Sequence, residues 1–133
     1  MRTVFLDTVG LLAVWDVADQ WHMAAEPVFQ TLLRDRVRLV TTPLVLYECG
    51  NAAARKSYRP SVDLFRRELQ QFGDLLEPLP QVIEQAWADY AHGIVGSAGI
   101  VDHVSFAIMR RFGIMDAFTN DRHFQMAGFT ILF

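Results

Sequence analysis

The chain has 133 residues, which is enough for one ordinary domain and too few for two domains with separate cores. Apolar residues make up 52% of it and charged residues 20%, a composition that excludes a disordered or collagen-like chain and predicts a sizeable core. The net charge of −3 argues against general electrostatic capture of nucleic acid. Any nucleic-acid contact must therefore be local or metal-assisted.

The single cysteine, Cys49, excludes an internal disulfide, and no apolar run approaches the roughly 18 residues that a membrane helix needs. The first residues do not resemble a secretory signal, because Asp7 falls inside what would be its apolar region. We therefore expect a cytoplasmic protein without membrane contact.

The first third of the chain predicts a strand followed by two helices. Residues 3–7 form a continuous apolar run that ends in an acid, which favours a strand buried on both faces. Helices are expected at 11–17 and 20–36. The predicted core positions of the second helix are Met23, Val28, Leu32 and Leu33.

The next strand is expected at 37–41. Thr42 follows it as a helix cap, and Pro43 is suited to the first turn of a helix that continues to about residue 55. The segment 58–61, which contains Pro60, is expected to interrupt the helical pattern.

The rest of the chain continues the alternation. Helices are expected at 62–72, 81–95 and 102–111, and strands at 75–79, 117–121 and 129–133. Strands that alternate with helices predict a parallel sheet with right-handed crossovers. We therefore expect one α/β domain over residues 1–133, a three-layer α/β/α sandwich around a mostly parallel sheet of about five strands.

Three acids stand alone in apolar stretches. Asp7, Glu48 and Asp102 are the only charged residues in the runs 3–15, 39–54 and 90–109, respectively. An unpaired buried carboxylate costs several kcal/mol, so such a group binds a partner, is protonated or lies at the rim of a cleft. Asp121 joins them because it ends the fourth predicted strand as Asp7 ends the first, and ligands bind at the carboxyl edge of an open α/β sheet.

Four clustered carboxylates repel one another unless a cation lies among them. Ligation by oxygen alone suits Mg²⁺ or Mn²⁺ rather than zinc. Such an ion activates water and stabilises charge on a phosphoryl oxygen, so the pattern indicates a metal-dependent phosphoesterase or nuclease.

Each acid also has a local interpretation. Asp7 and Asp102 could cap the helices that follow them, and Glu48 could pair with Arg55 or Arg59. Asp121 could simply form a turn in its Asn-Asp-Arg-His segment.

The chain resembles PIN-domain ribonucleases, and among them VapC-type toxins of bacterial toxin–antitoxin pairs. The resemblance spans nearly the whole chain and is carried by residues 4–8, 44–48, 100–110, 117–124 and 127–129. It implies that Asp7, Glu48, Asp102 and Asp121 bind Mg²⁺ or Mn²⁺ and cleave RNA. It also implies a cognate antitoxin that blocks the cleft and a homodimer.

One departure from the family pattern concerns the residue two positions after the first aspartate, where a small hydroxyl or amide residue is usual and this chain has Val9. Thr8, Ser105 or Thr119 could supply the missing hydrogen bond, and such outer contacts commonly change metal affinity tenfold or more. The alternative hypothesis is a catalytically weak or inactive PIN-like module that binds RNA or protein.

Basic residues near the acidic segments are candidates for RNA contact, namely Arg55, Lys56, Arg59 and Arg110, with Arg111 and Arg122 as further ones. A zinc site of Cys49, His103 and His123 is disfavoured because no Cys/His spacing pattern is present. Serine hydrolase chemistry is disfavoured as well, because Ser105 lies inside a predicted helix and lacks a nucleophile-elbow turn.

Overall fold

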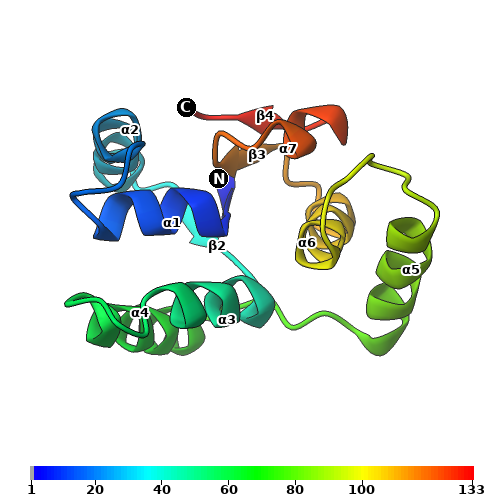
Figure 1. Cartoon of the computed structure of the whole chain (residues 1–133), viewed down its shortest axis with the longest axis horizontal. Helices are drawn as coiled ribbons and strands as arrows, with labels where there is room; N and C mark the ends of the chain where they lie inside the picture. Colours follow the sequence, from blue (N-terminus) through cyan, green and yellow to red (C-terminus); the bar gives the residue numbers. More distant parts are fainter. Residues whose placement is uncertain (1) are drawn as a thin grey trace.

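The structure, a computed structural model, describes residues 2–133. Four short strands form one sheet in which every pairing is parallel, in the order β2-β1-β3-β4 (Figure 1). The strands are β1 (Thr3–Leu6), β2 (Arg38–Val40), β3 (Asp116–Phe118) and β4 (Thr130–Ile131). The predicted α/β class and parallel sheet are confirmed, with four strands in place of about five.

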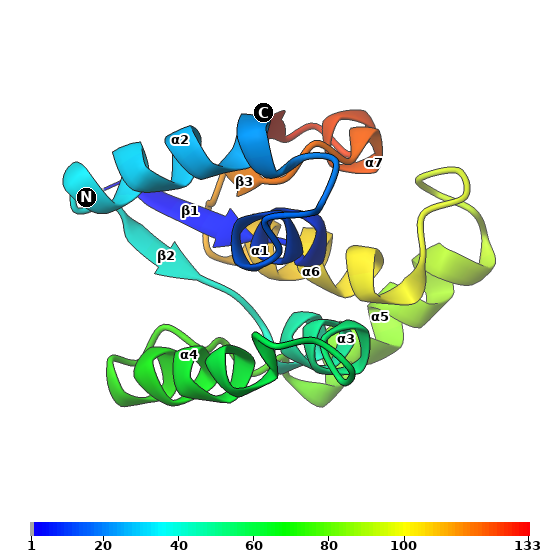
Figure 2. The same ribbon diagram turned by 60° about the vertical axis from the view of Figure 1, so that its left-hand side comes forward.

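Seven helices surround these strands. They are α1 (Thr8–Trp15), α2 (His22–Arg34), α3 (Pro43–Ala52), α4 (Arg59–Gln71), α5 (Pro80–Ala91), α6 (Ile100–Arg111) and α7 (Arg122–Met126). Figure 1 shows α1 and α2 on one side of the strands and α6 with α5 on the other, so the sheet forms the middle layer, and Figure 2 shows α3 and α4 together beyond the edge strand β2. Helix α5 packs against α6 (Figure 1). Between residues 2 and 133, no helix combines the length and the apolar character that crossing a membrane requires.

The predicted strand at 75–79 is the one that the structure does not contain. Leu75 forms an isolated parallel bridge with Thr41, and the Leu76 N–H donates to the Thr41 carbonyl at 2.8 Å. The pairing stops there because Pro78 has no N–H to donate to a ladder. The segment then passes into α5, which begins at Pro80.

Proline also explains where α4 begins. The segment 58–61 was expected to break the pattern, but Pro60 lies in the first turn of α4, where its missing N–H removes no helical hydrogen bond. The Thr42 cap of α3 is confirmed, since its hydroxyl accepts from the Val45 N–H at 3.4 Å.

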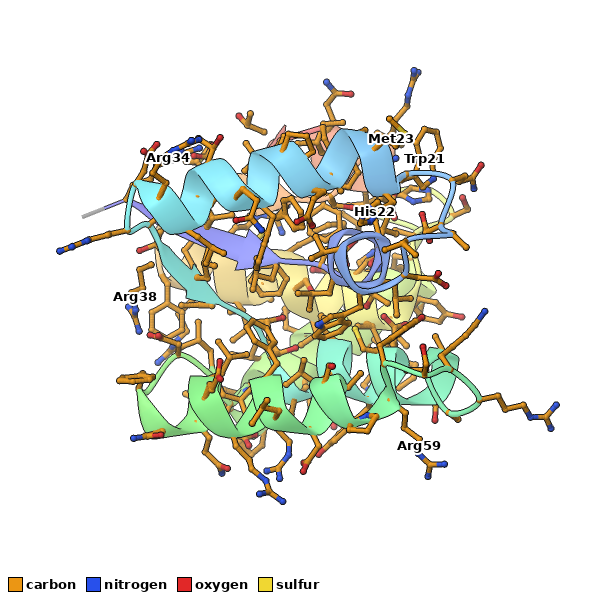
Figure 3. The ribbon with its side chains drawn as sticks, turned by 90° about the vertical axis from the view of Figure 1, so that its left-hand side faces the viewer. Trp21, His22, Met23, Arg34, Arg38 and Arg59 are labelled. Atoms are coloured by element: carbon orange, nitrogen blue, oxygen red, sulfur yellow. The ribbon has the colours of Figure 1, made fainter. Side chains whose placement is uncertain are left out.

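The core lies between the sheet and the helices and includes the central strand residues Val4, Phe5 and Leu6. Of the predicted core positions in α2, Leu32 is buried and Val28 packs against the core. The expectation was wrong for Leu33, which is exposed, and for Met23, which is 87% exposed at the start of α2 (Figure 3). The side chains of α2 that face the core belong to residues 25, 28 and 32, at the spacing i, i+3, i+7. Met23 and Leu33 lie outside this stripe.

Candidate functional site

The sheet register brings Asp7 next to the end of β3. Leu6 pairs with Phe118 in neighbouring parallel strands, so Asp7 and Thr119, the residues that follow them, leave the sheet side by side. The Thr119 hydroxyl donates to Asp7 Oδ2 at 2.8 Å and accepts from the Asp121 N–H at 3.0 Å. Thr119 therefore connects the first and the last of the predicted acids.

A glycine allows this close approach. A Cβ atom on Gly10, in the first turns of α1, would collide with the backbone oxygen and the ring of Phe118. Because no side chain is present, α1 can begin directly over the end of β3. The absence of a side chain at this position thus helps to place Asp7, which precedes α1 and is only 2% exposed.

Asp102 and Asp121 meet from two other elements. Asp102 lies in the first turn of α6, and Asp121 precedes α7. Their carboxylates and the imidazole of His123 offer ligand atoms that all lie within 4.8 Å of one another. In the part of the chain that the structure describes, this is the one group of three or more side chains able to hold a metal ion.

His123 holds the Asp121 carboxylate from two directions. Its backbone N–H donates to Asp121 Oδ1 at 2.9 Å, and its Nδ1 lies 2.9 Å from the same oxygen. The other ring nitrogen, Nε2, lies 3.2 Å from the Ser97 hydroxyl. These contacts hold Asp121 Oδ1 in place.

Glu48 completes the cluster from α3. The Thr8 hydroxyl donates to Glu48 Oε1 at 2.6 Å, which ties α3 to the start of α1. Glu48 and Asp102 line one cleft of about 320 Å³ together with Tyr90 and the start of α6. Four acids that are far apart in the sequence therefore converge at the carboxyl edge of the sheet.

Burial and neighbouring charges raise the pKa of two of these acids. Burial raises the pKa of Asp7 from its ordinary 3.8 to about 7, with smaller upward contributions from the charges of Asp121 and Glu48, and the Thr119 hydrogen bond offsets only part of this. Burial also raises the pKa of Asp102 to about 8, assisted by the charges of Asp7, Asp121 and Glu48.

The cluster has no strong cation of its own. Among residues 2–133, no lysine or arginine forms an ion pair with Asp7, Glu48, Asp102 or Asp121, and the single partner is His123. Clustered carboxylates repel one another and offer oxygen atoms as ligands, and hard divalent cations prefer such oxygen ligands. The residues present therefore fit such an ion, and the cluster could hold one.

The local interpretations of the acids can be compared with these contacts. Asp7 occupies the cap position of α1, but its side chain makes no capping hydrogen bond. Asp102 lies inside α6, whose cap position is Gly99, and Glu48 contacts Thr8 rather than an arginine. Asp121 does cap α7 through the His123 N–H, so for this residue the local role and membership of the cluster coexist.

The proposed outer contacts differ from one another. The hydroxyls of Thr8 and Thr119 reach Glu48 and Asp7, whereas the Ser105 hydroxyl donates to the Val101 carbonyl within α6 at 3.0 Å. Thr8 and Thr119 therefore donate hydrogen bonds to the acids, which the side chain of Val9 cannot do.

The basic candidates for RNA contact are dispersed. Arg110 lies about 12 Å along α6 from Asp102, where it donates to the Ala127 carbonyl and stacks over Phe129. Lys56 Nζ lies 3.7 Å from Asp16, and Arg59 donates to the Ala54 carbonyl while pointing away from the strands (Figure 3). Arg55, Arg111 and Arg122 are exposed, and Arg122 directly follows Asp121.

The zinc alternative does not fit the arrangement. Cys49 and His103 are outside the metal-competent group described above. Burial raises the pKa of the Cys49 thiol to about 12, with the nearby charges of Asp7 and Glu48 adding to the effect. A thiol that stays protonated is a poor zinc ligand.

The sequence interpretation missed two features of the site. His123 was considered only for zinc, although its position two residues after Asp121 is a signal for a side chain that orients that acid; the strand expected to end at Asp121 ends at Phe118, and Asp121 is the cap residue of α7. Tyr90 gave no signal, because an aromatic residue in a helical pattern normally indicates a core position; here it is 45% exposed and lines the acidic cleft.

Comparison with solved structures confirms the PIN-like fold. VapC20 of Mycobacterium tuberculosis, described as a sarcin-ricin loop cleaving toxin, superimposes with a TM-score of 0.77 at 22% identity, over 96% of each chain. FitAcB from Neisseria gonorrhoeae gives 0.61 at 16% identity, over 98% of this chain and 96% of the other. PAE2754 from Pyrobaculum aerophilum gives 0.54 at 17% identity, over 98% and 89%.

No protein-family model matches the sequence, and no curated protein sequence matches it either. The likeness to VapC-type toxins is therefore established at the level of the fold, over almost the full length of the chain.

Proposed function

We propose that this protein is an Mg²⁺- or Mn²⁺-dependent endoribonuclease, the toxin of a type II toxin–antitoxin pair. The observation that carries the proposal is the convergence of Asp7, Glu48, Asp102 and Asp121 without a lysine or arginine partner among the described residues. The fold, shared with a toxin described as cleaving the sarcin-ricin loop, supports the same reading.

In this proposal Asp7, Asp102 and Asp121 are the principal metal ligands, and Glu48 binds an outer water or a second ion. When bound, such an ion supplies Lewis-acid chemistry, activating water as a nucleophile and offsetting charge on a phosphodiester. Thr119, Thr8 and His123 hold Asp7, Glu48 and Asp121 in place through hydrogen bonds. The raised pKa values of Asp7 and Asp102 allow both groups to release a proton near neutral pH when a cation arrives.

The resemblance supports further parts of the proposal. We expect a cognate antitoxin that covers the acidic cleft, a homodimer and action on RNA in the cytoplasm. Arg55, Lys56, Arg59 and Arg110 remain proposed RNA contacts, and Arg122 has the shortest sequence separation from an acid of the cluster.

The test is cleavage of RNA by purified, antitoxin-free protein with Mg²⁺, with Mn²⁺ and with a chelator. Asp102→Asn should abolish cleavage and preserve folding, while Asp116→Asn, at the opposite end of the sheet, should leave cleavage intact. Expression in a bacterial host should arrest growth, and Asp102→Asn should relieve the arrest. Absence of both RNA cleavage and metal-dependent thermal stabilisation would replace the nuclease by a binding module.

A further inference from the structure

We propose that the ring of Tyr90 is a stacking platform for an unpaired nucleobase of the RNA substrate, next to the phosphodiester held at the acids. The inference rests on the proposed nuclease function and specifies how its substrate is bound. Tyr90, from the last turn of α5, lines the same cleft of about 320 Å³ as Glu48 and Asp102. No other aromatic side chain lines this cleft within residues 2–133.

The ring is exposed and yet fixed. It stands edge-to-face against His103, with ring centroids 6.0 Å apart and an interplanar angle of 89°. His103 is itself buried, its Nδ1 lies 2.8 Å from the Gly99 carbonyl, and its ring packs against Phe106 in the core. Asp102 and His103 are neighbours in α6. The same helix turn therefore positions a carboxylate of the cleft and the imidazole against which the Tyr90 ring packs.

Trp87 is a second aromatic neighbour of the Tyr90 ring. Its ring lies one helical turn before Tyr90, 5.6 Å away at 89°, and is 48% exposed. A side chain packed against two aromatic neighbours loses little further freedom when a ligand stacks on it, which favours binding.

The charge of the cleft explains why an aromatic contact is needed. Glu48 and Asp102 repel phosphate, and no lysine or arginine lines the cleft in the described part of the chain. Affinity for RNA at this position must therefore come from the metal and from contacts to the base. Stacking on an aromatic ring serves every base, and it requires a nucleotide that is free of a duplex. The expected substrate is consequently an unpaired segment or a loop.

The experiment compares wild type with Tyr90→Phe, which keeps the ring, and Tyr90→Leu, which keeps apolar volume without it. The substrate is a single-stranded oligoribonucleotide with 2-aminopurine beside the cleavage site. We expect Tyr90→Leu to raise KM about 5-fold to about 150-fold, with a smaller change in kcat. Fluorescence quenching on binding should persist in Tyr90→Phe and disappear in Tyr90→Leu. Tyr90→Met repeats the test if the leucine variant does not fold.

The outcomes separate the two proposals. If wild type neither binds nor cleaves RNA, the proposed function fails. If wild type cleaves RNA and Tyr90→Leu has the same KM and the same quenching, the platform alone is overturned. A change in the molecular mass of the assembly for Tyr90→Leu, with unchanged KM, would also overturn it and assign the aromatic pair to contact between copies of the chain.

Discussion

The acids at the two ends of the central sheet differ in their partners, even where their exposure to water is the same. At the amino ends, Asp116 pairs with Arg2 at 3.0 Å and Asp74 pairs with Arg38 at 2.8 Å. The side chains of these acids are 25% and 22% exposed, and that of Asp121 at the carboxyl end is 24% exposed. Asp121 therefore has the same access to water as the two amino-end acids, and what differs is the arginine partner.

This difference separates acids in ordinary ion pairs from the acids that we propose to be functional. An exposed ion pair contributes about 1 kcal/mol or less, so the amino-end acids are easily accommodated and carry little energy. Burial, assisted by the neighbouring carboxylates, raises the pKa of Asp7 and Asp102, and the cluster has no arginine or lysine partner among residues 2–133. A fold keeps such an arrangement at a cost to stability, which is typical of a site that binds a cation from outside.

The largest effect is expected when one acid at each end of the sheet is replaced by asparagine and the two variants are compared. Asp7→Asn preserves shape and should reduce RNA cleavage by a factor on the order of 1,000, because a buried ligand loses its charge. It should also raise the melting temperature of the metal-free protein at pH 8, because the desolvated charge is gone. Asp116→Asn is the matched control and should change neither property appreciably. Full activity of Asp7→Asn would contradict the proposed difference between the two ends of the sheet.

The pH dependence of stability should differ between the two ends as well. The folded protein holds the proton on Asp7 up to a pKa of about 7, against 3.8 when unfolded, so the free energy of unfolding should fall as pH rises from about 4 to about 7. The loss is at most about 4 kcal/mol, at about 1.4 kcal/mol per pKa unit. Denaturant titrations in a chelator measure it. Asp7→Asn should make the profile less steep and leave the part that Asp102 contributes, and an equally steep profile in that variant would contradict the assignment.

The next effect concerns the threonine that connects Asp7 to Asp121. Thr119→Val keeps the shape of the side chain and removes the bond to Asp7 Oδ2 and the acceptor of the Asp121 N–H. Metal affinity and cleavage should fall about 10-fold to about 100-fold. Thr130→Val, on the exposed β4, should have no such effect. Wild-type affinity in Thr119→Val would show that the two acids are positioned without this residue.

The smallest predicted effect concerns how closely α1 approaches the sheet. Gly10→Ala places a Cβ against the Phe118 backbone oxygen and should destabilise the fold by about 1–3 kcal/mol. Gly50→Ala, inside α3 with nothing within 4 Å of its Cβ position, should be neutral or stabilising by up to about 1 kcal/mol. Thermal unfolding of both variants measures the difference, and equal melting temperatures would show that the close approach of α1 does not require a glycine at position 10.

The sequence predicted most of the fold because its signals were local. The apolar run before Asp7 and the Thr42-Pro43 cap depend on neighbours in the chain, and both elements appear where expected. The strand at 75–79 failed because pairing depends on N–H groups that Pro78 cannot offer. Met23 and Leu33 failed because the inward face of a helix is set by the layer on which it packs.

For the candidate site, isolation in apolar sequence was the informative property. It selected Asp7, Glu48 and Asp102, and the structure brings them together with Asp121. Isolation says nothing about which neutral side chains bind the acids, so Thr119, Thr8 and Ser105 could not be ranked in advance. It also gives no information about Tyr90, whose position follows from the packing of α5 on α6.

The most direct test of the cation site is calorimetric titration of the metal-free protein with Mn²⁺ at pH 7, in two buffers of different ionisation enthalpy. We expect saturable binding with release of protons, because Asp7 and Asp102 hold protons near this pH until a cation displaces them. Binding should disappear in Asp102→Asn and persist in Asp116→Asn. Absence of saturable binding in the wild type, or equal binding in Asp102→Asn, would contradict the assignment of this edge as a metal site.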